Sequence, residues 1–393
     1  MQLMVSQDQR VSSASAKAGR PFERVIATRF VPSDPASIPP RAWLYGRHLI
    51  RRNVSVTVAP GGVGKSSLTI VQALELVTGR RLLGGWNAGP MKVWLFNLED
   101  ERSELDRRIA AAMKHYEINP ADIEGRLFVD TGREQQLILA NQIRDDVQID
   151  RRLIDDLKLQ LTSNEIDVLI VDPFVSSHRV NEMDNGKIDY VTKEWVRLAE
   201  HCGCAVELVH HTRKLNGAEA TSDASRGASS LINAARSARV LQRLADDELR
   251  EAGVAGDGCT YFSVKRDKAN LAGSGEKETF RTVSVDLGQG DQVGVVEVWK
   301  KPSLFEGLSW RELLEVQEAI DGHDYRYSDQ AGVQWVGLVI SKALSLSLPK
   351  DKPRIKKMIE IWLQTGALKK VMKKLDNGKT GPVLEVGEWS SKN

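Results

Sequence analysis

The sequence is poor in cysteine and has no long hydrophobic run. Its three cysteines, Cys202, Cys204 and Cys259, are too few and too unevenly spaced for a disulfide framework, which indicates a reducing cytoplasm. No second ligand pair stands at zinc spacing from Cys202 and Cys204, so we interpret both as buried thiols. No run of about 18 apolar residues occurs, so no membrane-spanning helix is expected. The first twenty residues lack the apolar core of a signal peptide.

Neither positive nor negative charge is in excess over the whole chain. The net charge of +2 in 393 residues says little about partners, and the 41% hydrophobic and 27% charged content is typical of a globular protein. The length allows two domains with ordinary cores. We predict a disordered or extended segment at 1–40, a core at 41–302 and a smaller domain at 303–393.

The most informative stretch is glycine-rich and lies between an apolar run and a helical pattern. It reads Ala-Pro-Gly-Gly-Val-Gly-Lys-Ser over residues 59–66. In a strand–loop–helix unit of this kind, backbone N–H groups and the helix N-terminus surround a phosphate. Lys65 is then placed to reach the β- and γ-phosphates and Ser66 to ligate Mg²⁺. The sequence therefore predicts that ATP binds with Mg²⁺ to Pro60, Gly61, Gly62, Val63, Gly64, Lys65, Ser66 and Ser67.

Strand-like and helix-like runs alternate from about residue 44 to 300. Near-continuous apolar strands between helices predict a buried, largely parallel sheet, and later strands joined by glycine-containing turns predict an antiparallel extension. The predicted strands are Val54–Val58, Val93–Asn97, Leu127–Val129, Val168–Val171, Ala205–Val209, Ala238–Leu241, Tyr261–Val264, Arg281–Asp286 and Val295–Trp299. The predicted helices are Ser67–Val77, Arg102–His115, Asp145–Leu161, Ile188–Cys202 and Gly227–Ala235.

Acidic residues follow two of these strands. Asp172 closes an apolar strand, where a carboxylate can hold Mg²⁺ directly or through water. Glu99 ends the strand Val93–Asn97 and Asp100 follows it. If that strand lies beside the phosphate-loop strand, Glu99 can orient and deprotonate the attacking water, whereas Asp100 suits a helix N-cap.

Two histidines end a third strand. His210 and His211 can touch the γ-phosphate and report its presence to the segment that follows, or they can simply cap the strand end. That segment begins with Arg213 and Lys214, and a long polar loop in a compact domain is often functional, so we expect it to contact nucleic-acid phosphates. The loop after Asp172, which contains Arg179, is a second candidate, although its polarity also fits plain solvent exposure.

A basic unit follows residue 302. Ser309–Ile320 begins with a capping-box pattern, a second helix runs from Pro353 through Leu363, and two strands flank a turn at 376–378. This outline predicts a winged-helix-like domain. Residues 341–393 hold twelve Lys or Arg against five acids, a net charge of +7. Lys356 and Lys357 are therefore candidate nucleic-acid contacts, with a solvated basic face as the alternative.

Taken together, these residues resemble the RecA-like core of plasmid RepA-type hexameric helicases, which are related to DnaB-type replicative helicases. The resemblance covers roughly residues 40–300. It rests on residues 59–66, Leu98-Glu99-Asp100, Ile170-Val171-Asp172-Pro173, His210-His211-Thr212-Arg213-Lys214 and Ser225-Arg226-Gly227-Ala228-Ser229-Ser230.

The resemblance implies a homo-oligomer, a hexamer, with ATP held between subunits. Lys65 and Ser66 would bind phosphate and Mg²⁺, Glu99 would be the catalytic base, Asp172 the Walker-B carboxylate and His211 the γ-phosphate sensor. Arg236 matches the arginine finger of the RepA type. DnaB-like relatives use a basic strand instead, here Arg266 or Lys268, and an exposed arginine without this role is a further possibility.

One feature departs from the resemblance, because the short RepA-type chains lack a C-terminal unit like 303–393. The core motifs nevertheless favour an ATP-driven motor that unwinds DNA at a plasmid or phage origin and grips single strands in a central channel. A DNA-binding regulatory or loader ATPase, or a RecA-like recombination mediator, is the alternative.

Overall fold

The computed structural model describes residues 26–212, 228–252, 254, 256–269, 271, 277–288, 290–301, 309–375, 378 and 380–391. The chain divides into two units, Met1–Arg41 and Ala42–Asn393. In the first unit, every described side chain is exposed, and the regular structure over 26–41 is a short 3-10 helix, η1, at Pro35–Ser37.

A nine-stranded sheet organises the described part of the second unit. Its order is β14-β13-β12-β11-β3-β10-β8-β4-β5. Strands β11, β3, β10, β8, β4 and β5 are parallel, and β12, β13 and β14 extend the sheet in antiparallel fashion. The strands are β3 Val54–Pro60, β4 Val93–Asn97, β5 Leu127–Thr131, β8 Val168–Asp172, β10 Ala205–Thr212, β11 Ser237–Arg243, β12 Thr260–Ala269, β13 Glu278–Gly288 and β14 Asp291–Val298. The predicted α/β class and mostly parallel sheet are confirmed.

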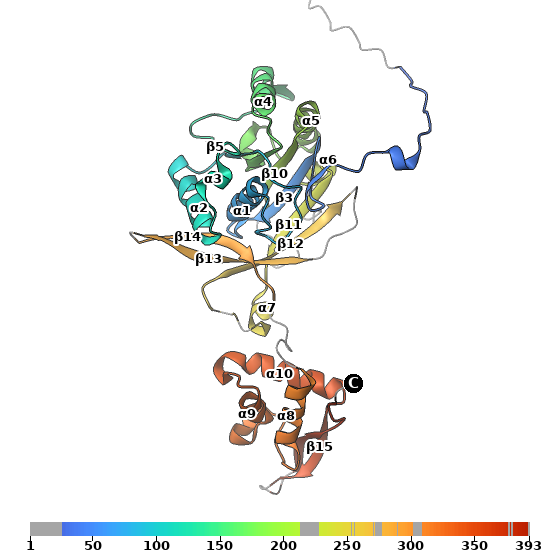
Figure 1. Ribbon diagram of the computed structural model, residues 1–393, viewed down its shortest axis with the longest axis vertical. Coiled ribbons are helices and arrows are strands. Elements are labelled where there is room, and N and C mark those ends of the chain that lie inside the picture. The colour runs from blue at the N-terminus through green and yellow to red at the C-terminus, as the bar shows by residue number, and fades with distance from the viewer. Residues whose placement is uncertain are drawn as a thin grey trace, which may run out of the picture. The chain divides into compact units, whose positions relative to one another are not determined.

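Helices cover both faces of this sheet because its central strands are apolar on both sides. One hydrophobic cluster joins the sheet to α1 and α2, with α3 at its margin, and another joins it to α4, α5 and α6 (Figure 1). The helices are α1 Lys65–Thr78, α2 Arg102–His115, α3 Pro120–Ile123, α4 Arg151–Ser163, α5 Asn185–Cys202, α6 Ala228–Ala234 and α7 Asp246–Glu251. Short elements η2 at Phe174–Ser177 and β9 at His178–Arg179 follow β8.

The antiparallel extension packs against α2. The Tyr116 hydroxyl, just past the end of α2, donates to the Val296 carbonyl of β14 at 2.7 Å. His115 lies 2.9 Å from Glu297, and Lys114 donates to the Asp286 carbonyl of β13 at 2.6 Å. These contacts hold β13 and β14 beside the helix that follows β4.

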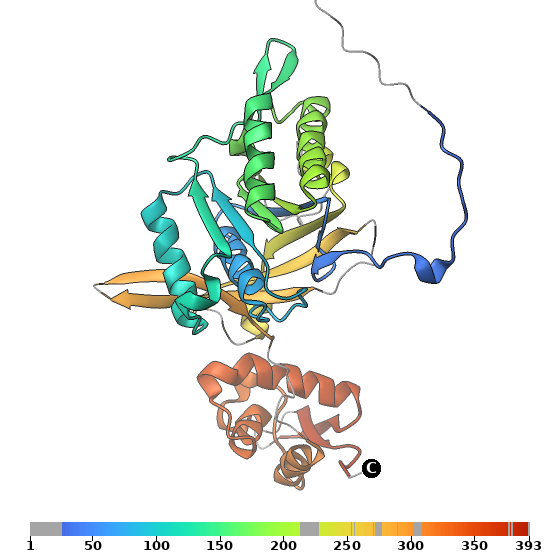
Figure 2. The same ribbon diagram turned by 45° about the horizontal axis from the view of Figure 1, so that its top comes forward.

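The prediction of a helix from Asp145 is wrong for its first residues. Residues 140–149 form a hairpin, β6 Ala140–Ile143 and β7 Asp146–Ile149, which pairs with β9 in a small separate sheet. Helix α4 starts only after Asp150, whose carboxylate accepts from the backbone N–H groups of Arg152 and Leu153. Figure 2 shows the hairpin in green, extending beyond the helices. A second unpredicted pair, β1 Trp43–Tyr45 and β2 Leu49–Ile50, precedes β3.

The C-terminal part has its own hydrophobic cluster. Its elements are α8 Trp310–Ile320, η4 Asp329–Gln334, α9 Val336–Ala343, α10 Leu348–Gln364, β15 Leu368–Lys374 and β16 Thr380–Val386. The capping box at Ser309 and Glu312 is confirmed. Arg326 bridges Val383 of the hairpin, so a third extended segment adjoins the two strands. Helices followed by a hairpin agree with the predicted outline, while the winged-helix likeness stays a prediction.

Two features of this part differ from the sequence expectation. Helix α9 was not predicted, and α10 begins at Leu348, so that Pro353 lies inside the helix. A proline in the second turn removes one backbone hydrogen bond. The helix forms nevertheless because its apolar face is buried in the cluster through Ile355, Met358 and Ile359. The predicted domain boundary falls among residues 302–308, outside the described residues, and stays a prediction. Among the described helices, none has the length and apolarity needed to cross a membrane.

Candidate nucleotide-binding site

The phosphate loop connects β3 to α1 at the carboxyl edge of the parallel strands. Strand β3 ends at Pro60 and α1 begins at Lys65, with Gly61 and Gly62 between them and Val63 buried in the core. Gly64 has φ of 101°, and a Cβ there would lie 3.3 Å from Thr282 Oγ1 and 3.4 Å from a Phe262 ring carbon. Glycine is required by both the left-handed backbone and the close approach of the extension.

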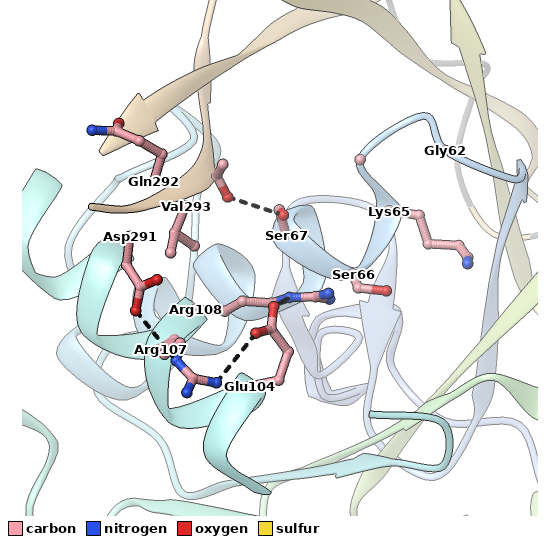
Figure 3. Close-up of a pocket in the computed structure, with 12 residues that line it drawn as sticks. Gly62, Lys65, Ser66, Ser67, Glu104, Arg107, Arg108, Asp291, Gln292 and Val293 are labelled. Carbon is pink, nitrogen blue, oxygen red and sulfur yellow. Dashed lines mark hydrogen bonds and ion pairs between the residues drawn. The ribbon is translucent and has the colours of Figure 1, made fainter. Parts of the chain in front are cut away.

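A pocket of about 490 Å³ opens beside this loop. Its walls come from the loop, from α2 and from the start of β14, as Figure 3 shows. Ser67 Oγ donates to the Gly294 carbonyl at 3.2 Å, which ties α1 to β14. The described residues that line it are Gly62, Gly64, Lys65, Ser66, Ser67, Glu104, Arg107, Arg108, Asp291, Gln292, Val293 and Gly294.

Lys65 faces two of the predicted catalytic residues. Its ammonium lies 2.7 Å from Nε2 and 2.9 Å from Nδ1 of His211 and donates to whichever nitrogen carries no proton. His211 Nε2 lies 3.7 Å from a Glu99 carboxylate oxygen. Burial and the charge of Lys65 lower the pKa of His211, so the ring is neutral at pH 7 and can accept this hydrogen bond. The structure thus brings Lys65, His211 and Glu99 together.

Glu99 reaches this position from a strand that is not adjacent to β3. Strands β10 and β8 lie between β3 and β4, so the adjacency on which the role of Glu99 was made conditional is not met. The residues meet nevertheless, because parallel strands end at one edge of the sheet. Asp100 is differently engaged, since it lies 2.9 Å from Arg108 Nη1. Glu99 is about half exposed and has its carboxylate toward His211, which favours it over Asp100 as the base.

Asp172 ends β8 and is 2% exposed. The Ser66 hydroxyl lies beside its carboxylate and acts to lower its pKa. Burial raises the pKa of Asp172, while the nearby Lys65 charge opposes that shift. Its Oδ2 is buried without a hydrogen-bond partner among the described residues. An orphaned carboxylate oxygen beside a serine hydroxyl is an oxygen donor set of the kind that Mg²⁺ prefers, so these residues fit the ion.

The arginine-finger candidates lie away from the pocket. Arg236 is exposed and precedes β11, and its N–H donates to the Val54 carbonyl at the opposite end of β3 from the loop. Arg266 of β12 lies in a different pocket, with Tyr45 and Arg239. The Lys268 side chain is outside the described part of the structure. Arg236 is therefore exposed, whereas Arg266 is partly enclosed by its own chain.

The residues predicted to contact nucleic acid lie in different surroundings. Arg179 is exposed on β9 rather than in a loop, and Arg213 and Lys214 lie outside the described residues. Lys356 is 2.6 Å from Asp329, and Lys357 is 3.0 Å from Glu360. Both lysines are therefore offset by acids of the same unit, which weakens the case drawn from net charge.

Sequence reasoning missed three cations near the phosphate loop. Arg107 and Arg108 lie on α2 in the pocket wall, and Arg243 at the end of β11 donates to the Gly62 carbonyl at 3.2 Å. The spacing of Arg108 from Glu104 was a usable signal, because residues four apart share a helix face, and Arg108 Nε lies 2.7 Å from Glu104. No local pattern could have placed Arg243 beside Gly62.

The fold and this site define a P-loop nucleotide-binding protein. Comparison with known families gives the same class independently: residues 21–217, half of the chain, match the AAA domain. The chain belongs to that family, and the family indicates an ATPase that binds nucleotide. Chemically, loop amides and Lys65 would hold the phosphates, and Ser66 with Asp172 would hold Mg²⁺, which neutralises phosphate charge when bound.

Proposed function

We propose that this chain is an ATP-hydrolysing nucleic-acid motor, a RepA-like DNA helicase that acts as a hexamer in plasmid or phage DNA replication. The core has a P-loop, a buried carboxylate at the end of β8 and a carboxylate at the end of β4 that all meet at one edge of the sheet. This is the set needed to bind and hydrolyse a nucleoside triphosphate.

One observation carries the motor proposal. His211 contacts Lys65 and approaches Glu99, so the last residues of β10 lie against the residues that would face the γ-phosphate. The chain continues directly from β10 into Arg213 and Lys214. Loss of the γ-phosphate would change the partners of Lys65 and His211 and shift the segment that carries these two cations. A strand of nucleic acid held by that segment would move with each turnover.

In this mechanism Glu99 accepts a proton from the attacking water while Lys65 stabilises the charge that develops on the phosphates. Asp172 and Ser66 would hold Mg²⁺, which would neutralise charge on the phosphates. Arg236 of one subunit stabilises the transition state at the site of its neighbour, which its exposure at the far end of β3 permits.

A second candidate function is a regulatory or loader ATPase that binds duplex DNA without unwinding it. The separately clustered C-terminal part, with helices and a hairpin, supports it. In that case the helix α10 or the hairpin would contact a duplex, and nucleotide would control assembly. The paired state of Lys356 and Lys357 makes this candidate the weaker one.

The deciding measurement is the steady-state ATPase rate with and without single-stranded DNA of several sequences. A motor is expected to show strong stimulation by any strand and unwinding of a forked duplex. Lys65→Ala serves as the inactive control, and Lys193→Ala, a surface lysine paired with Asp189 at 2.6 Å, serves as the matched active one. A rate that is indifferent to single strands would overturn the motor proposal and favour the regulatory one.

A further inference from the structure

Arg243 is a cation that contacts the phosphate loop without lining the nucleotide pocket. It is the last residue of β11, which lies beside β3 on the side away from β10. Its Nη2 donates to the Gly62 carbonyl at 3.2 Å. The side chain is exposed, and it is not among the described residues that line the pocket. The guanidinium therefore reaches the loop from outside the pocket.

The strands beside the loop fix the position of this arginine. Strand β11 is parallel to β3 and antiparallel to β12, and in the second ladder Arg243 lies opposite Phe262. The Phe262 ring stacks on Phe280 with 5.6 Å between centroids, and it also adjoins Gly64. Strands β11 and β12 therefore support the loop at two points, at Gly62 through a hydrogen bond and at Gly64 through an aromatic ring.

The peptide between Gly62 and Val63 is the part of the loop whose direction the arginine can determine. Val63 is 3% exposed, so its side chain anchors one end of this peptide in the core. Gly62 has φ of 74° and open space around it, and glycine leaves the other end free to turn. The peptide is trans, so its carbonyl and its N–H point in opposite directions.

Holding the carbonyl from outside thus directs the Val63 N–H away from Arg243. The residues on either side of this N–H, Gly62 and Gly64, both line the pocket. Loop N–H groups in such a position bind phosphate oxygens. A cation on the carbonyl also polarises the peptide and makes its N–H a stronger donor, because linked hydrogen bonds reinforce one another.

We infer that Arg243 is a positioning residue for the nucleotide, which holds the Gly62–Val63 peptide so that the Val63 N–H faces a phosphate. The arginine acts on the loop and does not touch the substrate. N–H groups of such a loop surround the α- and β-phosphates, which ATP and ADP share, so the two nucleotides should benefit equally. The inference rests on nucleotide binding at the phosphate loop and is independent of DNA.

The test is titration calorimetry of the full chain with Mg²⁺ and either ADP or a non-hydrolysable ATP analogue. Arg243→Met keeps an unbranched side chain and removes the donor, and it should weaken both nucleotides about tenfold or more, as expected for a lost charge-assisted hydrogen bond. Arg243→Lys should lose clearly less, because an ammonium can donate to the same carbonyl. The matched control is Arg152→Met, which removes an exposed arginine of α4.

Turnover separates positioning from catalysis. Because the loop holds ATP equally in the ground state and the transition state, Arg243→Met should raise KM about tenfold and leave kcat within about twofold of wild type. A fall in kcat, or a larger loss of affinity for the ATP analogue than for ADP, would place the guanidinium at the γ-phosphate and overturn the inference.

Salt separates positioning from simple attraction between Arg243 and the phosphates. Attraction through solvent is screened, so the ratio of wild-type to Arg243→Met affinity would approach one between about 50 mM and 500 mM KCl. A positioning role predicts a ratio that stays within about twofold over the same range, and a ratio that collapses would overturn it.

Two further outcomes decide the matter. Equal affinities of wild type and Arg243→Met would overturn this inference alone, whereas a wild-type chain that binds no nucleotide would contradict the proposed function as well. Urea unfolding without nucleotide should give the same free energy for both chains, since the side chain is exposed. A less stable Arg243→Met chain would assign the lost affinity to a general structural role and overturn positioning.

Discussion

Charged side chains in the core and in the C-terminal part are treated differently by their surroundings. In the core, Lys65, Asp172 and Glu75 are buried, and burial shifts the pKa of each. In the C-terminal part, Lys356 and Asp329 pair at the surface, as do Lys373 and Asp324. Buried charges shift pKa values and bind ligands strongly, whereas exposed pairs contribute little. Position in the fold, rather than number, therefore decides what a charge does.

The largest effect is expected for Lys65→Ala. Because Lys65 is the buried cation that faces His211 and the phosphate position, its loss should reduce ATP turnover to background. Phosphate release by the purified chain measures it, with Lys193→Ala as the control. Near-normal turnover in Lys65→Ala would contradict the assignment of the nucleotide site itself.

Arg236→Ala tests the exposed cation of the core that we assign to a neighbour's site. Loss of an arginine finger should slow turnover by about 10³–10⁵-fold. Mixing the inactive Arg236→Ala chain with the inactive Lys65→Ala chain should restore part of the activity, since one then supplies the arginine and the other the loop. Full activity of Arg236→Ala alone would shift the assignment to Arg266 or Lys268.

Glu99→Gln should stop hydrolysis while ATP stays bound, because the amide cannot take the proton from water. The expected loss is about 10²–10⁴-fold in turnover. Equilibrium binding of labelled ATP and single-turnover hydrolysis measure the two properties separately. Asp100→Asn, the neighbouring acid paired with Arg108, should lose less. Wild-type turnover in Glu99→Gln would assign the base to Asp100.

Glu75→Gln measures the cost of a buried charge in the core. Burial raises the pKa of Glu75 to about 7, although it accepts hydrogen bonds from Leu83 N–H and the Tyr45 hydroxyl. The unfolded chain loses this proton near pH 4.5, so wild-type stability should fall as pH rises from about 4.5 to 7. The full loss is on the order of 3 kcal/mol.

The free energy of unfolding in urea at pH 5 and pH 8 tests this. Glu75→Gln should fall less than wild type between the two values and be the more stable chain at pH 8. Parallel pH profiles for the two chains would show that Glu75 keeps an ordinary pKa.

The smallest effect is expected for Lys356→Ala. Since Asp329 already offsets this charge, its removal should change the salt dependence of DNA binding by clearly less than one phosphate contact. Lys370→Ala is the contrast, because Lys370 lies 3.7 Å from the Tyr327 ring centroid, and a neutral ring leaves its charge available to a DNA phosphate. Its removal should therefore lower the salt slope by about one. Equal slopes for both variants would break the distinction between paired and stacked lysines.

The sequence correctly predicted those elements whose structure depends mainly on their own residues and immediate neighbours. The phosphate loop, α2 at Arg102–His115 and the strand ends at Asp172 and His211 follow from apolar runs, glycines and caps. The hairpin at 140–149 was missed because Asp145, Val147 and Ile149 fit either a helix or a strand over so short a run. Its choice depends on pairing with β9, far along the chain.

The composition of the site was harder to predict than its central residues. Sheet order separates β4 from β3 by two strands, and no sequence spacing reveals that. Arg107, Arg108 and Arg243 reach the phosphate loop only through packing, and the pocket around Arg239 joins residues from 45 to 278. The pairing of Lys356 with Asp329 likewise depends on how η4 meets α10.

Because Ser67 contacts Gly294, which lies 227 residues later, the nucleotide pocket is completed only late in synthesis. When a ribosome has just completed the AAA match at residue 217, β3, α1, β4, β8 and β10 have been synthesised, but the strands that flank the phosphate loop on its other side have not. The wall formed by β14 emerges some eighty residues later. Until β14 is made, the pocket lacks one of its walls, so ATP bound at that stage would contact the phosphate loop and α2 alone.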